Sequence, residues 1–269
     1  MIIDFEFEDV KKFLPKRDIS SNKYDSGQLL IIGGDEKYPG AIILAAQMAI
    51  KSGVGLTYLY TKSQNVIKVL KEFPEIIVFD NQDRLAEILS DNIPILAGPG
   101  TLNNKWTQET YDLIKDNPIT TILDAAYIEQ IKIDNSLKAK ILLPHEGEAA
   151  KLLGVSSLEI KENRVKSILT ISNKFNCYVI LKGYRTLISD GKEVYRCMNG
   201  DSKLSTAGTG DVLAGLVGGL MAQGLEIMQC CQVAVALHGS SSDDYSHSKN
   251  LIASELVDQM YKFNEWDNI

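Results

Sequence analysis

The stretch "STAGTGDVLAGLVGGLMAQG", Ser205 to Gly224, decides how the rest of the sequence is interpreted. It places small and hydroxyl residues, two glycines and one carboxylate, Asp211, before a helix built largely of Gly, Ala, Leu and Val. The first N–H groups of a helix have no partner inside it and lie at the positive end of its dipole, so they bind anions such as phosphate. Gly208 and Gly210 remove Cβ atoms that would hold a phosphoryl group away from those amides. The stretch therefore predicts a phosphate-binding helix start.

Asp211 itself has two interpretations. A carboxylate beside a phosphate dianion is repelled unless a magnesium ion or a reacting proton justifies it, so its position indicates a general base for a nearby hydroxyl. The alternative is a helix cap, in which the Asp211 side chain accepts a hydrogen bond from a free backbone N–H. We expect the glycines further along the helix, Gly215, Gly218 and Gly219, to serve close packing.

Composition narrows the classes of function. With 269 residues, 45% of them hydrophobic, the chain can bury a large core, and we expect a single domain over residues 1–269. The formal net charge of −7 argues against a protein that grips nucleic acid by broad phosphate neutralisation. The longest apolar run, Ala41 to Ile50, contains Gln47 and falls short of the roughly 18 to 20 residues that span a bilayer.

Cysteine, histidine and the N-terminus point to a compartment. The four cysteines form no CxxC pair and the chain has three histidines, so a zinc site is not expected. The N-terminus is acidic and lacks a signal-peptide pattern. We expect a soluble, reduced, cytoplasmic protein with no metal-ligating residues of its own and with neither nucleic acid nor a membrane as partner.

Short apolar runs alternate with longer segments of helical period, which is typical of an α/β fold with a mostly parallel sheet and helices on both faces. The expected strands are Leu29–Ile32, Leu56–Tyr60, Ile76–Phe79, Ile93–Ala97, Thr120–Leu123 and Ile141–Leu143, and the expected helices are Ala41–Ser52, Arg84–Ser90, Lys105–Lys115 and Gly147–Leu153. After these, "CYVILKG" and "RTLISDGKEVYRC" predict strands joined by at least one hairpin, hence an antiparallel edge. Beyond Asp211 the chain reads as helical almost to its end, with Gly224 separating two helices.

Several motifs together carry a resemblance. The segments are "LIIGGDEKYPGAIILAAQMAIKSGVGL", "LAGPG", "LLPHEGEAAKLLG", "LKGYRTLIS" and "TAGTGDVLAG", and the match runs from near Phe13 to "LIASELVDQM". In this order the chain resembles the nucleotide-dependent NAD(P)H-hydrate dehydratase family of the ribokinase-like superfamily. The resemblance implies a ribokinase-like three-layer fold. It also implies that ADP or ATP with Mg²⁺ is used to dehydrate hydrated NADH or NADPH.

The resemblance assigns roles residue by residue. Asp211 would activate the substrate hydroxyl as catalytic base, and the substrate contacts would be Ala41, Leu102, His145 and Asp211. The nucleotide contacts would be Lys182, Gly183, Tyr184, Arg185, Thr186 and Gly210, with Lys182 near phosphate. From the residues alone, two alternatives stay open: His145 caps the following helix, and the Lys-Gly pair forms an ordinary turn. Glu148 fits a first-turn helix residue better than a catalyst.

Three departures fall mostly on the substrate side. Leu102 stands where the family usually has a glycine, Ala126 where it usually has an aspartate after Asp124, and Lys203 lies in a segment close to the phosphate region. They keep two alternatives open, a small-alcohol kinase of the same superfamily and a nucleotide-binding protein without catalysis. The resemblance further implies a homo-oligomer, a tetramer. An epimerase domain precedes this one in some family members, and we expect any epimerase to be a separate protein.

Overall fold

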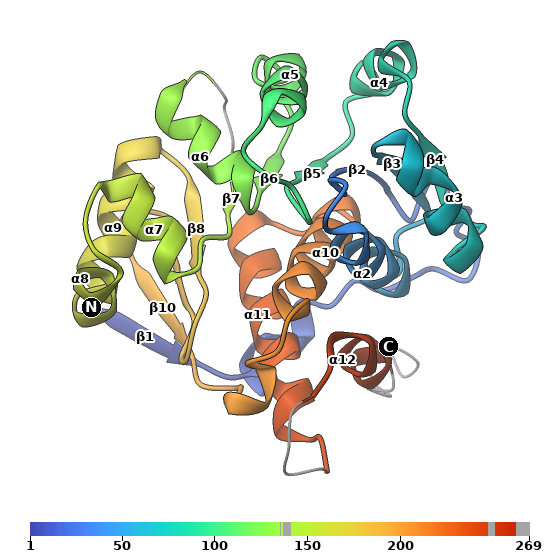
Figure 1. Ribbon diagram of the computed structural model, residues 1–269. Helices are drawn as coiled ribbons and strands as arrows, with labels where there is room; N and C mark the ends of the chain where they lie inside the picture. Colours follow the sequence, from blue (N-terminus) through green and yellow to red (C-terminus); the bar gives the residue numbers. More distant parts are fainter. Residues whose placement is uncertain (135, 137–140, 247–250, 262–269) are drawn as a thin grey trace.

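The computed structural model describes residues 1–134, 136, 141–246 and 251–261. Within these residues, ten strands form one sheet in the order β1-β10-β9-β8-β7-β6-β5-β2-β3-β4 (Figure 1). The strands are β1 (Ile2–Phe5), β2 (Gln28–Ile32), β3 (Leu56–Tyr60), β4 (Ile77–Phe79), β5 (Ile95–Ala97), β6 (Thr121–Leu123), β7 (Ile141–Leu142), β8 (Tyr178–Leu181), β9 (Leu187–Ser189) and β10 (Val194–Cys197).

Helices fill most of the remaining described chain. They are α1 (Phe7–Val10), α2 (Pro39–Lys51), α3 (Ser63–Glu72), α4 (Gln82–Leu89), α5 (Lys105–Ile114), α6 (Ala126–Ile133), α7 (Glu146–Leu153), α8 (Ser157–Glu162), α9 (Arg164–Phe175), α10 (Thr209–Ala222), α11 (Ile227–Asp243) and α12 (Ala253–Tyr261), with 3₁₀ turns η1 (Lys11–Phe13) and η2 (Ser202–Leu204). None of the described helices combines the length and the apolar character that a membrane span requires.

The sheet is mostly parallel with an antiparallel region near one edge, as the sequence predicts. Strand β9 runs antiparallel to both β8 and β10, and Asp190 and Gly191 form the β9–β10 turn, in which the Asp190 side chain accepts from the Lys192 N–H at 2.9 Å. Strand β1 pairs parallel with β10 and forms the outermost strand on that side. The sequence analysis does not predict β1, because only Phe5 of its four residues is buried.

The strands are covered on both faces. In β2, Leu29 and Ile31 belong to one core cluster, whereas Leu30 and Ile32 belong to the other. Successive side chains of a strand point to opposite faces, so a strand buried on both sides reads as a continuous apolar run. Helices α2, α10, α11 and α12 pack on one face, and α5, α6, α7 and α9 on the other (Figure 1). The three-layer arrangement is confirmed.

Helix α10 is set deep in its layer because small residues let it approach α2. A Cβ on Gly215 would lie 2.1 Å from the Ala45 carbonyl oxygen, and one on Gly219 would lie 1.9 Å from the Ser52 Oγ. A Cβ on Gly218 would lie 3.1 Å from the Leu29 side chain. The expected packing role of these glycines is confirmed, and it fixes the position at which α10 begins.

Element boundaries shift by one or two residues from those expected. Strand β5 begins at Ile95 rather than Ile93, since Pro94 has no N–H for the ladder, although its carbonyl accepts from Leu30 at 3.0 Å. Helix α9 is not predicted because two of its five buried residues are serines, Ser167 and Ser172, which weaken the apolar period.

Candidate functional site

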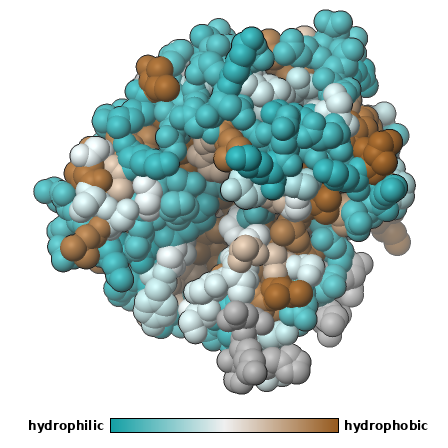
Figure 2. Space-filling view, viewed as in Figure 1, coloured by the Kyte–Doolittle hydropathy of each residue, from teal (hydrophilic) through white to brown (hydrophobic). Residues whose placement is uncertain are grey.

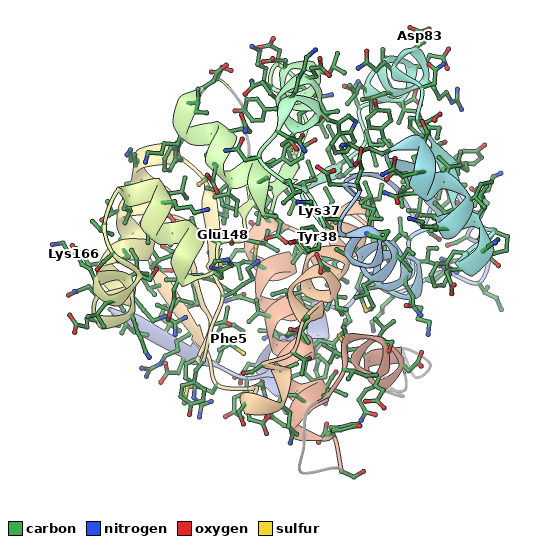
Figure 3. All side chains as sticks on the ribbon, viewed as in Figure 1. Phe5, Lys37, Tyr38, Asp83, Glu148 and Lys166 are labelled. Carbon is green, nitrogen blue, oxygen red and sulfur yellow. The ribbon has the colours of Figure 1, made fainter. Side chains whose placement is uncertain are left out.

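The residues singled out in the sequence meet at the carboxyl ends of the central strands. Asp124 follows β6, His145 precedes α7, Lys182 follows β8, and Asp211 lies in the first turn of α10. Open α/β sheets bind ligands at this edge. Figure 3 labels Glu148, on α7, near the middle of the view, and Figure 2 shows the surface hollowed there.

The start of α10 differs from a side-chain-capped helix. Gly208 is the N-cap residue with φ +92°, no side chain caps the helix, and Asp211 is its third residue. The capping alternative for Asp211 is therefore wrong. A Cβ on Gly208 would lie 2.6 Å from the Leu44 side chain. The positive φ and this close packing therefore require a glycine here, and access of a phosphoryl group to the helix does not. Gly210, by contrast, lies beside the Lys182 ammonium, which is 3.7 Å from where its Cβ would be.

Three carboxylates and one ammonium share the interior of the site. Lys182 Nζ lies 2.7 Å from Asp124 Oδ1 and 4.0 Å from Glu148 Oε2, and the three side chains are 17%, 5% and 13% exposed. Burial opposes the charge of Lys182, but Asp124 and Glu148 outweigh it and raise the pKa of the lysine. The ammonium is thus held by protein carboxylates.

Burial and the neighbouring charges shift the pKa of Asp211. Burial raises the pKa of Asp211 to about 7, the negative charges of Asp124 and Glu148 add to the rise, and Lys182 opposes it. Burial also raises the pKa of Glu148. A carboxyl group that titrates near neutral pH has the proton affinity that general-base catalysis requires.

The structure gives Lys182 a partner that the sequence does not predict. The resemblance implies a lysine near phosphate, and in the structure its ammonium forms an ion pair with Asp124. Lys182 nonetheless lines one wall of a cavity of about 620 Å³. The other residues predicted to bind the nucleotide line the same cavity, namely Gly183, Tyr184, Arg185, Thr186 and Gly210.

Sequence reasoning missed, among others, His238 in the wall of this cavity and Asp243, which holds a loop of that wall. Asp243, on α11, accepts from the Gly200 N–H at 3.0 Å and from Asn199 Nδ2 at 3.2 Å, and so holds the loop that borders the cavity. His238 lines the cavity one turn earlier, with Nε2 3.0 Å from the Thr209 carbonyl, and burial lowers its pKa to about 4. Both residues lie on α11. A histidine and an aspartate five positions apart on a helix form no recognisable motif, so the sequence did not single them out.

The residues expected on the substrate side lie near the start of α2, in the loop between β5 and α5, and directly before α7. A Cβ on Gly100 would lie 2.9 Å from the Ala41 Cβ, so the loop that carries Leu102 packs against the start of α2. His145 caps α7, since its Nδ1 accepts from the Gly147 N–H at 2.9 Å while Glu148 accepts from the His145 N–H at 2.8 Å. The capping alternative is confirmed for His145. The His145 Nε2 lies 3.5 Å from Glu148 Oε1, and the His145 side chain is 60% exposed.

Two of the residues that depart from the family pattern, Ala126 and Lys203, have defined surroundings in the structure. Ala126 is the first residue of α6 and is buried, and Asp124, two residues earlier, is the carboxylate that reaches Lys182. Lys203 pairs with Asp201 at 2.8 Å, and Asp201 lines the 620 Å³ cavity. Among the residues that the structure describes, no group of three or more His, Cys, Asp or Glu side chains is placed to hold a metal ion.

Known proteins resemble this chain in both sequence and fold. The sequence profile described as NAD(P)H-hydrate dehydratase matches residues 29–262. The chain belongs to this family. The ribokinase-like fold that the resemblance implies is confirmed by solved structures.

Three members of the comparison illustrate the likeness. The chain is 31% identical over 258 residues to a bifunctional NAD(P)H-hydrate repair enzyme of Coxiella burnetii, covering 93% of this chain and 53% of the relative. It is 31% identical over 261 residues to an ADP-dependent (S)-NAD(P)H-hydrate dehydratase of Neisseria meningitidis, covering 91% and 86%. The crystal structure of the Bacillus subtilis ADP/ATP-dependent NAD(P)H-hydrate dehydratase, co-crystallised with ATP and Mg²⁺, matches with a TM-score of 0.85, 26% identity and coverage of 99% and 98%. The chain spans about half the length of the bifunctional relatives it matches.

The buried ion pair leads to a stability prediction. Lys182→Met leaves Asp124 buried without its partner, so we expect a loss of about 3 kcal/mol in the free energy of unfolding. Adding Asp124→Asn removes the unpaired charge and should recover part of that loss. Urea denaturation of the two variants, with the exposed Lys166→Met as control, measures the effect. A Lys182→Met protein as stable as the parent would contradict the ion pair.

Proposed function

We propose that the chain catalyses the nucleotide-dependent dehydration of hydrated NADH and NADPH and so restores the reduced cofactor. The observation that carries the proposal is the half-buried Asp211 carboxyl, with a pKa near 7, at the start of a helix beside a nucleotide-sized cavity. Membership of the family and the activity named for the Neisseria meningitidis relative support it.

The reaction needs two steps, because hydroxide is a poor leaving group. In the first, the Asp211 carboxylate takes the proton of the hydrate's hydroxyl, whose oxygen attacks the terminal phosphorus of the nucleotide. The phosphorus–oxygen bond to the rest of the nucleotide breaks, so ATP leaves as ADP, or ADP as AMP. In the second, the carbon–oxygen bond breaks and its electrons leave with phosphate, while the lone pair of the ring nitrogen forms a carbon–nitrogen double bond. Loss of a ring proton then restores the dihydronicotinamide.

The nucleotide belongs in the 620 Å³ cavity. Gly210 and the first turn of α10 face it with helix N–H groups, which favour phosphate oxygens. Gly183, Tyr184, Arg185 and Thr186 line the same cavity. In this arrangement Lys182 contributes positive charge from beneath the phosphates while paired with Asp124, and Mg²⁺ accompanies the phosphates.

The hydrate occupies the other side of Asp211. We assign its contacts to Ala41, at the start of α2, to Leu102, in the loop that packs there, and to the exposed edge of His145. With these contacts the hydroxyl lies between Asp211 and the nucleotide's terminal phosphate. Residues 1–269 act as one domain in this proposal, and the cytoplasm, where reduced nicotinamide cofactors are used, is the proposed compartment.

The activity has a direct optical test. Hydrated NADH lacks the dihydronicotinamide chromophore, so the parent protein with Mg²⁺ and ADP or ATP should restore near-ultraviolet absorbance. Asp211→Asn keeps the size of the side chain but removes the base, and the rate should fall about a hundredfold to ten-thousandfold. Nucleotide binding, measured as a rise in melting temperature, should persist in the variant.

Two results would contradict this assignment. Full activity in Asp211→Asn would contradict the role of Asp211 as catalytic base. A parent protein that binds nucleotide but never restores the absorbance would contradict the dehydratase activity. Accumulation of a phosphorylated product would instead identify a kinase.

The proposed assembly is a homotetramer. Helix α11 contributes Cys230, Cys231 and the run from Val233 to Leu237 to the buried core. Exposed apolar side chains lie instead at the uncovered edge of the sheet, where Ile67 on α3 is 60% exposed and Ile77 on the edge strand β4 is 39% exposed. Light scattering should give four times the chain mass of 29.7 kDa. A mass of one chain at working concentration would contradict the tetramer.

A further inference from the structure

A second cavity opens on the other side of the carboxylate cluster. It is a groove of about 800 Å³ between α6 and α7, and His145 and Asn103 line it. His145 Nε2 lies 3.5 Å from Glu148 Oε1, and Glu148 Oε2 lies 4.0 Å from Lys182, which lines the nucleotide cavity. Three consecutive side chains thus connect the two cavities, with the buried carboxylates between them.

The proposed substrate needs a second cavity. A hydrated dinucleotide carries its reacting ring at one end and a diphosphate with adenosine at the other. If the ring lies at Asp211 and ADP or ATP fills the 620 Å³ cavity, the rest of the dinucleotide must leave the site by another route. The groove begins at His145 and at the residue after Leu102, both assigned to the substrate side, and its volume is within the usual range for ligand sites.

The groove has the chemistry of a phosphate and purine site. Lys132 Nζ donates to the Lys151 carbonyl at 2.7 Å, and no carboxylate within the described chain lies at ion-pair distance from it. Lys151, by contrast, is paired with Glu129 at 2.6 Å. Asn103 accepts from Gln130 at 3.0 Å through Oδ1, so its Nδ2 group is the donor that a ligand would meet. Apolar surface for a base comes from Ile133, Ala150 and Val155.

We propose that the groove between α6 and α7 binds the diphosphate and adenosine half of the hydrated dinucleotide, with Lys132 as the cation that contacts its phosphates. The proposal rests on the proposed function and adds the location of the non-reacting half of the substrate. It makes Lys132 a binding residue that acts on substrate affinity and not on the chemical step.

The other cavity at this edge of the sheet is less suitable. It measures about 380 Å³ and is lined by Tyr60, Lys62 and Trp106. Lys62 is already paired with Asp35 at 2.9 Å and lies 3.6 Å from Glu36, so its charge is compensated within the protein. The α6–α7 groove has twice that volume and an uncompensated cation.

The test compares two substrates that share the reacting ring. Hydrated NADH carries the diphosphate and adenosine, and hydrated reduced nicotinamide riboside carries neither. Lys132→Gln keeps a donor for the Lys151 carbonyl but removes the charge, so KM for hydrated NADH should rise about tenfold with kcat unchanged. KM for the riboside and for ADP or ATP should stay at the parent's values.

Two further variants serve as controls. Lys132→Arg keeps the charge and should behave as the parent, and Lys166→Gln, on the exposed face of α9 at the left edge of Figure 3, should change neither substrate's KM. A merely structural role for Lys132 would lower the melting temperature and affect both substrates alike.

Several outcomes would overturn the proposal that the groove binds the dinucleotide. They are an equal change in KM for both substrates, a change confined to the KM of ADP or ATP, and a parent whose KM is the same for hydrated NADH and for the riboside. If the parent turns over neither substrate, the proposed function fails, and the groove is judged separately by calorimetry with hydrated NADH. In that case, equal affinity of the parent and Lys132→Gln would overturn it.

Discussion

The buried contact between Lys182 and Asp124 is the interaction on which the rest of the site depends. It places one ammonium, that of Lys182, among the three carboxylates of Asp124, Glu148 and Asp211. Burial raises the pKa of Asp211 to about 7, and the negative charges of Asp124 and Glu148 add to the rise. Glu148 of this cluster lies between His145, which lines the α6–α7 groove, and Lys182, which lines the 620 Å³ cavity.

The position of Asp211 relies on backbone packing more than on capping. Glycines bring α10 against α2, and Gly208, at φ +92°, turns the chain into the helix without a side-chain cap. The first turn of α10 therefore presents its N–H groups and its carboxylate at the same place. The stretch from Ser205 thus combines two glycines in different settings, Gly208 at the turn into the helix and Gly210 beside the Lys182 ammonium, with one carboxylate in the first turn.

Much of the fold follows from local sequence, and the electrostatics of the site do not. The buried runs at Leu29–Ile32 and Leu56–Tyr60 predict central strands directly, because both faces of each strand are covered. The pairing of Lys182 with Asp124 joins residues 58 positions apart, and it depends on β6 and β8 flanking β7, which no local pattern reveals. The ion pair of Lys182 could not be predicted from the sequence for that reason, and its role near phosphate stays a prediction. His145 was ambiguous because a cap and a substrate contact use different edges of one ring.

The central claim is that burial, together with the neighbouring carboxylates, raises the pKa of the Asp211 carboxyl to about 7, and a direct titration tests it. Carbon-13 NMR of protein labelled at aspartate carboxyls, with Asp211→Asn to assign the signal, follows this group between about pH 3 and 9. The folded-state pKa is raised above the unfolded value, so the signal should titrate at about pH 7. A midpoint near the ordinary aspartate value of 3.8 would contradict the account, since Asp211 would then be an unperturbed carboxylate.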